Sequence, residues 1–153
     1  MKKIILLPLI IFITACSNET TGIESTSADK EKTYNWRLVT SWPKNYPGLG
    51  MAPERIADLV EEMSDGQMKI TVYGAEEQVP AFGVFDAVSS GSHQMGHSGG
   101  YFWKGKVPAA QFFTSVPFGL TADEINAWVN RGGGLELWRE IYAPFNIYPI
   151  PAG

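Results

Sequence analysis

The chain has 153 residues, of which 44% are hydrophobic and 18% are charged, with 16 acidic against 12 basic side chains. Its net charge of −4 gives no support for nucleic-acid binding, which requires a basic surface. Cys16 is the only cysteine, so the chain contains no internal disulfide.

Residues 1–15 are expected to be a signal peptide. Lys2 and Lys3 precede an apolar run, residues 4–13, which is shorter than the roughly 20 residues needed to span a bilayer. The run ends in Ile-Thr-Ala-Cys, which resembles a bacterial lipobox, so Cys16 is expected to carry lipid. The alternative is an ordinary signal peptide with an incidental cysteine. Removal of residues 1–15 lowers the basic count from 12 to 10 and the net charge to −6.

Residues 16–33 are expected to be the lipidated cysteine and a flexible tether. The segment after Cys16, SNETTGIESTSADKEKT, has almost no large apolar side chains, so folding would not compensate the entropy lost on ordering. Residues 34–153 then form one α/β domain, since their length fits a single domain.

Strand and helix signals alternate through the first half of this domain. Apolar and polar residues alternate from Trp36 to Ser41, which predicts a first strand ending before Pro43. A helix is predicted from Pro53 to Gly66, followed by a second strand over Met68–Tyr73. The next helix is predicted to carry Phe82, Phe85 and Val88 on one face and to end at Gly91. A short extended segment is predicted from His93 to His97.

The second half is predicted to be helical until its last residues. Thr121 and Glu124 form a capping box, the Arg131–Gly134 run interrupts the helix, and Leu135–Tyr142 resumes it. Phe145–Ile150 is predicted to be a final strand, which gives the order β-α-β-α-β-α-α-β and a mostly parallel sheet covered by helices. Because the chain stops where that strand should turn, it is expected to be a fragment.

A small-molecule site is expected where the strands end, because ligands of open α/β sheets sit beyond the carboxyl ends of the strands. Trp42 follows the first strand, although it could instead pack within its loop. Glu77 follows the second strand and could meet a ligand hydroxyl or start the next helix. Ser98 could donate a hydrogen bond to a carboxylate or cap the local backbone. After the two glycines, Tyr101 could contact a ligand through its ring and its phenol, and Phe102 through its apolar ring alone.

An enzyme is the alternative, because Gly96-His97-Ser98-Gly99-Gly100 matches the G-x-S-x-G nucleophile elbow of α/β-hydrolases. A polar, short segment precedes Ser98, whereas the elbow follows an apolar strand. No histidine follows His97 in the chain, although the hydrolase fold places its catalytic histidine last. We therefore favour a binding protein over an esterase.

Three other features carry weaker signals. His93 and His97 would lie about 13 Å apart on a strand and could not share a metal ion. His93 is expected to be satisfied or solvent-facing, and His97 is left open between pocket wall and structural residue. The triple glycine is interpreted as a helix break, and Trp128 and Trp138 as core residues.

Several long motifs resemble one transport family. The motifs are WRLVTSWPKNYPGLG, VPAFGVFDAVSSG, QMGHS, YFWKGKVPAAQFF, VPFGLTADE and GGGLELW. They are similar to motifs of the solute-binding subunits of TRAP (tripartite ATP-independent periplasmic) transporters, in particular the 2-oxo acid and small-carboxylate subgroup. The resemblance covers residues 36–153. Two departures are the Glu76-Glu77 pair, where Gly-Glu is expected, and Gly99-Gly100, where less flexible small residues are usual.

The resemblance implies a periplasmic-binding-protein-like α/β lobe, with the second lobe largely missing. It implies a periplasmic, non-enzymatic receptor that delivers a small carboxylate to TRAP membrane permease subunits. The carboxylate-clamping arginine and metal-coordinating residues of the family lie further along than this chain extends. No cofactor or metal site is therefore assigned to these residues, although a metal ion is possible in a full-length protein.

The lipobox interpretation predicts that Cys16→Ser abolishes incorporation of labelled fatty acid when the chain is expressed in a bacterium. The reason is that the thiol of Cys16 is the acceptor of the lipid. Equal labelling of the wild type and of Cys16→Ser would contradict the interpretation.

Overall fold

The computed structural model describes residues 32–152. The predicted signal peptide, Cys16 and most of the tether lie outside these residues and stay predictions. The regular elements are β1 (Tyr34–Thr40), α1 (Met51–Met63), β2 (Met68–Tyr73), α2 (Val84–Ser89), β3 (Met95–His97), α3 (Ala122–Arg131) and α4 (Gly134–Tyr142). Short 3₁₀ helices cover Ala81–Gly83, Gly100–Trp103, Pro108–Phe113 and Ala143–Phe145. Over the described stretch, no helix is long and apolar enough to cross a membrane.

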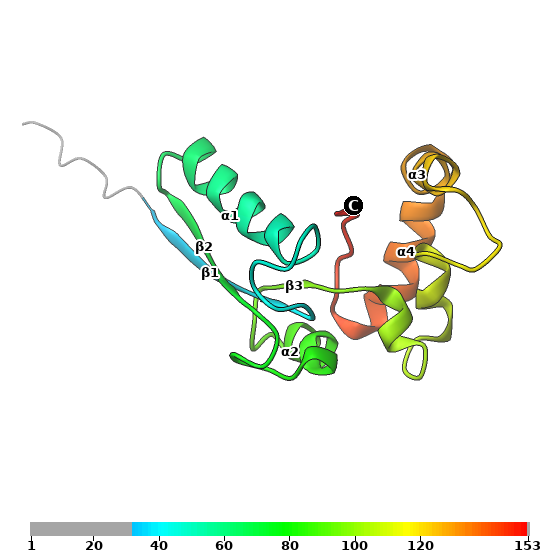
Figure 1. The fold of residues 1–153 in the computed structure, drawn as a ribbon, viewed down its shortest axis with the longest axis horizontal. Coiled ribbons are helices and arrows are strands. Elements are labelled where there is room, and N and C mark those ends of the chain that lie inside the picture. Colours follow the sequence, from blue (N-terminus) through cyan, green and yellow to red (C-terminus); the bar gives the residue numbers. More distant parts are fainter. Residues whose placement is uncertain (1–31, 153) are drawn as a thin grey trace, which may run out of the picture. The chain divides into compact units, whose positions relative to one another are not determined.

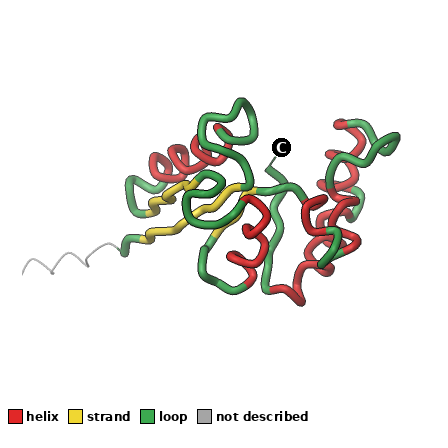
Figure 2. The backbone as a smooth tube through the Cα atoms, turned by 60° about the horizontal axis from the view of Figure 1, so that its bottom comes forward, coloured by secondary structure: helices red, strands yellow, loops and turns green. Residues whose placement is uncertain are grey.

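The described strands form one parallel sheet in the order β2-β1-β3, with β1 in the middle (Figures 1 and 2). Leu38 of β1 lies beside Val72 of β2 and beside Met95 of β3. Parallel neighbours need a crossover connection, and α1 and α2 supply the two crossovers. The predicted α/β class with a parallel sheet covered by helices is confirmed.

The two crossover helices cover opposite faces of the sheet (Figure 1). Leu38 packs in one apolar cluster with Ala57 of α1, whereas the next residue, Val39, packs in another with Val84 and Phe85 of α2. Successive side chains of a strand point to opposite faces, so the carboxyl half of β1 is buried on both sides. β1 ends at Thr40, and the loop after it begins at Ser41, which is also buried.

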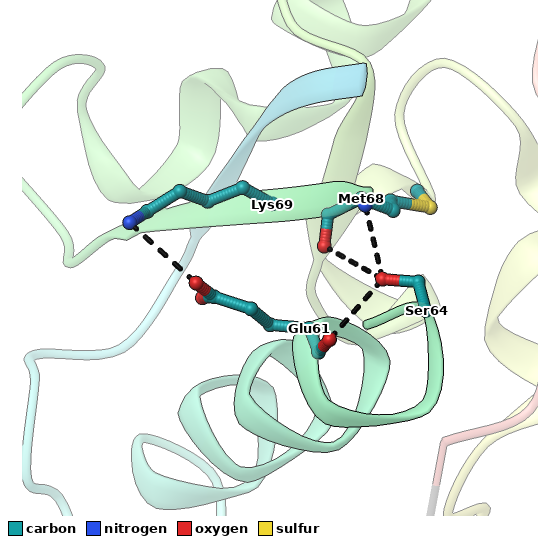
Figure 3. A network of polar contacts seen from close by, with 4 residues as sticks. All are labelled: Glu61, Ser64, Met68 and Lys69. Carbon is teal, nitrogen blue, oxygen red and sulfur yellow. Dashed lines mark hydrogen bonds and ion pairs between the residues drawn. The ribbon is translucent and has the colours of Figure 1, made fainter. Parts of the chain in front are cut away.

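A polar network joins the end of α1 to the start of β2 (Figure 3). The Ser64 hydroxyl donates to the Glu61 carbonyl at 3.2 Å and accepts the Met68 N–H at 2.9 Å. Lys69 forms an ion pair with Glu61 at 3.7 Å. The turn continues through Gly66, whose φ of 76° suits a glycine, so the helix stops at Met63, slightly before the predicted Gly66.

Two expectations from the sequence are wrong in detail. Phe82 lies in the 3₁₀ turn before α2 and is 67% exposed, so it does not share the buried face of Phe85. Phe145–Ile150 forms no strand within residues 32–152. Asn146 takes a left-handed φ of 57°, which breaks the extended run, and Ile147 packs against the core instead.

The helical second half agrees with the sequence. Thr121 and Glu124 form the predicted capping box, and Gly133, with φ of 85°, separates α3 from α4. The Trp128 and Trp138 rings stack on the Phe113 ring, with centroids 5.5 and 5.3 Å away. Trp138 packs against the core, as predicted, whereas Trp128 is half-buried and lies outside the two core clusters.

Gly96 generates a prediction about the packing of β3 on α2. A Cβ at Gly96 would lie 2.7 Å from Val84 Cγ1 and 2.8 Å from Val88 Cγ2, which is closer than side chains tolerate. Gly96→Ala is expected to lower the free energy of unfolding by about 1–3 kcal/mol, measured by urea denaturation. Gly105→Ala is the matched control, because a Cβ there meets no atom within 4 Å. Equal stability of the two variants would contradict the packing.

The two histidines around β3 generate a prediction about pH. Burial lowers the pKa of His97, and burial followed by the nearby Arg37 charge lowers the pKa of His93. The unfolded chain then binds more protons than the folded chain below about pH 6.5, so stability present above that pH is lost as the pH falls. Urea unfolding between pH 7.5 and 5.5 should show this loss, and His93→Gln/His97→Gln should reduce it. An unchanged loss in the double variant would contradict this account.

Candidate functional site

The carboxyl ends of the three described strands meet at one edge of the sheet. The Ser41 N–H donates to the His97 carbonyl at 3.0 Å, which joins the loops after β1 and β3. The Ala75 N–H donates to the Trp42 carbonyl at 3.0 Å, which joins the loops after β2 and β1. In the order β2-β1-β3 the topological switch point lies between β1 and β3, where open α/β sheets bind ligands.

Two hydroxyl groups meet at this switch point. Ser41 Oγ and Ser98 Oγ are 2.6 Å apart, and Ser41 Oγ also donates to the Ala81 carbonyl at 2.7 Å. Ser41 is only 8% exposed, while Ser98 is half-buried. The sequence interpretation missed Ser41, although it follows β1 directly, as Ser98 follows β3. The position of a serine directly after each of these two strands was the sequence signal that could have identified Ser41.

Aromatic rings from the segments that follow the three strands contact one another and form an aromatic wall. The Phe102 ring contacts the rings of Trp42, Tyr101 and Phe82, with centroids 6.2, 4.5 and 5.1 Å away. The His97 ring lies 4.9 Å from Trp42. The structure thus brings together the predicted residues Trp42, Tyr101 and Phe102, and adds Phe82 and His97 to them.

The two glycines after Ser98 allow close packing at this wall. A Cβ at Gly99 would lie 2.5 Å from Tyr101 Cζ, so the Tyr101 ring folds back over the Gly99 backbone. Tyr101 nevertheless remains 41% exposed. A Cβ at Gly100 would lie 2.4 Å from the Ala110 carbonyl oxygen, which is backbone and cannot move aside easily. Gly100 therefore needs a residue without a side chain, whereas a side chain at Gly99 would only displace the exposed Tyr101 ring.

Glu77 holds two loops together, which neither expectation from the sequence included. Its carboxylate accepts the Gly74 N–H at 3.1 Å and pairs with Lys44 at 3.4 Å, which ties the turn after β2 to the loop after β1. It does not start a helix, because the next helical residue is Ala81. Glu76, where the resemblance expects glycine, takes a left-handed φ of 69°, and its carboxylate accepts the Ala81 N–H at 3.1 Å.

The hydrolase alternative finds no support in this geometry. Within residues 32–152, Ser98 Oγ hydrogen bonds to Ser41 and not to a histidine. Buried His97 Nδ1 has no partner among the described residues. Ser98 also lacks a positive φ, whereas the nucleophile elbow is a strained turn. Nothing in this arrangement activates Ser98 as a nucleophile.

Other candidate sites lie apart from the strand ends. Among residues 32–152, no three His, Cys, Asp or Glu side chains are grouped to hold a metal ion. An apolar hollow of about 270 Å³ is lined by residues of the 112–128 region, and none of its lining residues comes from the loops after the strands.

Comparisons with known proteins show which family the chain resembles. The family model described as bacterial extracellular solute-binding protein, family 7, matches residues 38–149. A protein of Nostoc sp. strain PCC 7120, named a monocarboxylate 2-oxoacid-binding periplasmic protein, is 48% identical over 118 residues, which cover 77% of this chain and 32% of the relative.

Two solved structures are similar in fold and sequence. A TRAP periplasmic solute-binding protein from Pseudoalteromonas atlantica, with bound sodium and pyruvate, is 48% identical, with a TM-score of 0.77 over 80% of this chain and 37% of that chain. One from Colwellia psychrerythraea, with bound calcium and pyruvate, is 43% identical, with the same TM-score and coverage. The chain spans about a third of the length of these relatives. The predicted resemblance to TRAP solute-binding proteins is confirmed, and the chain belongs to family 7 of the bacterial extracellular solute-binding proteins.

Proposed function

We propose that this chain forms one wall of the ligand site of a TRAP-type receptor, which captures a small carboxylate such as a 2-oxo acid for ion-coupled uptake. The observation that carries the proposal is the meeting of the strand ends at Ser41 and Ser98, beside an aromatic wall. The pyruvate bound to two relatives of similar fold supports the class of ligand.

The residues of this wall would act by excluding water and by orienting the ligand. Trp42 and Phe102 supply apolar surface, and hydrogen bonds to a carboxylate are stronger where water is excluded. Tyr101 is partly exposed, and its phenol can donate to a carboxylate oxygen. Ser98 lies beside these rings, and Glu77 acts through the turn that it holds. In this proposal the role of Glu77 is therefore indirect.

The same proposal covers partners and location. Closure of a second lobe on the ligand would form the surface that membrane permease subunits recognise, a hinge mechanism without chemistry. The receptor would lie in the periplasm, held to a membrane by lipid on Cys16. Sodium or calcium accompanies pyruvate in the relatives. Among residues 32–152, no three His, Cys, Asp or Glu side chains are grouped to hold such an ion.

Transfer of this wall into a relative tests the proposed function. Residues 38–149, which the family model matches, would replace the equivalent segment of the Pseudoalteromonas atlantica protein, which is 48% identical to this chain. We expect this chimaera to bind pyruvate in calorimetry, with Trp42→Ala weakening the binding because the apolar wall is opened to water. The 153-residue chain alone should bind with a Kd above about 1 mM, since one wall supplies few of the contacts.

The control is the unmodified relative, measured under the same conditions. A chimaera with a native circular dichroism spectrum and cooperative unfolding that binds no pyruvate would contradict the proposed function. Micromolar binding by the chain alone would show that a single wall is a complete site.

A further inference from the structure

The direction of the two serine hydrogen bonds follows from counting protons. A hydroxyl group carries one proton, and a carbonyl oxygen can only accept. Ser41 Oγ lies 2.7 Å from the Ala81 carbonyl oxygen, so the single Ser41 proton is used in that bond. The 2.6 Å contact between Ser41 and Ser98 must then have Ser98 as its donor.

This order leaves Ser98 without a proton for the ligand. The Ser98 hydroxyl donates to Ser41, so it offers only lone pairs to the site. A carboxylate or keto oxygen of a ligand beside Ser98 would find no donor in the Ser98 hydroxyl, because both groups would be acceptors. A hydroxyl group of a ligand could instead donate to the Ser98 oxygen. This is opposite to the sequence expectation that Ser98 donates to a carboxylate.

The surroundings of Ser41 hold it in this orientation. Its own N–H is bound to the His97 carbonyl, which continues the pairing of β1 with β3, and its side chain is buried. The Ala81 segment is held as well, because the Ala81 N–H donates to Glu76 at 3.1 Å. If Ser41 instead donated its proton to Ser98, the hydrogen bond from Ser41 to the Ala81 carbonyl would be lost.

We propose that Ser41 is a positioning residue, which keeps Ser98 as a hydrogen-bond acceptor and thereby favours ligands with a donor at this position. This inference rests on the proposed function. Among small carboxylates, a 2-hydroxy acid presents such a donor and a 2-oxo acid does not. Ser41 therefore sets the relative affinity for these two kinds of ligand without touching either.

The test is the ratio of the lactate affinity to the pyruvate affinity. It is measured by calorimetry in the chimaera and by NMR titration in the 153-residue chain. Ser41→Ala frees the Ser98 proton to bind a keto oxygen, so the ratio should shift toward pyruvate by about fivefold. Ser41→Thr retains the hydroxyl and should keep the ratio of the wild type. A purely structural role would weaken both ligands equally and leave the ratio unchanged.

Ser98→Ala gives a second, independent measurement should Ser41→Ala not fold. It removes the acceptor, so lactate binding should weaken by about fivefold while pyruvate binding changes little. An unchanged ratio in folded Ser41→Ala, or equal losses of both ligands in Ser98→Ala, would overturn the role of Ser41. A folded chimaera that binds neither ligand before any substitution would instead overturn the proposed function.

Discussion

Parallel pairing of β1 with both of its neighbours is the constraint on which the candidate site depends. Leu38 is paired with β2 and β3 at the same point of the strand, so all three strands end at one edge. α1 and α2 bury opposite faces, which leaves that edge as the place where polar loop residues emerge. The Ser41 N–H bond to His97 extends the pairing into the loops and brings two hydroxyls together. A slip of this register would separate them.

Local signals in the sequence were sufficient for most of the fold. The alternation before Ser41, the capping box at Thr121 and the glycine at position 91 each depend on a few neighbouring residues, and each appears as predicted. Ser98, Tyr101 and Phe102 could be grouped at the mouth of β3 for a similar reason, since they are close in sequence.

Features that depend on contacts between distant segments were not predictable in this way. Ser41 and Ser98 are 57 residues apart, and their pairing requires the register of β1 with β3. Glu77 was assigned to a ligand or a helix start, but its partner Lys44 lies on another loop. Phe82 matched a helical face by spacing, yet a 3₁₀ turn directs it toward Phe102 instead. In each case tertiary packing overrides the local pattern.

Chemical-shift mapping tests most directly whether the strand ends are the ligand site. Pyruvate would be titrated at millimolar concentration into the ¹⁵N-labelled chain, with chloride at equal ionic strength as the control. The account predicts that shift changes concentrate in residues 41–42, 74–77 and 97–102, which form the meeting loops. Changes confined to the apolar hollow of the 112–128 region, with none at Ser41 or Ser98, would contradict it.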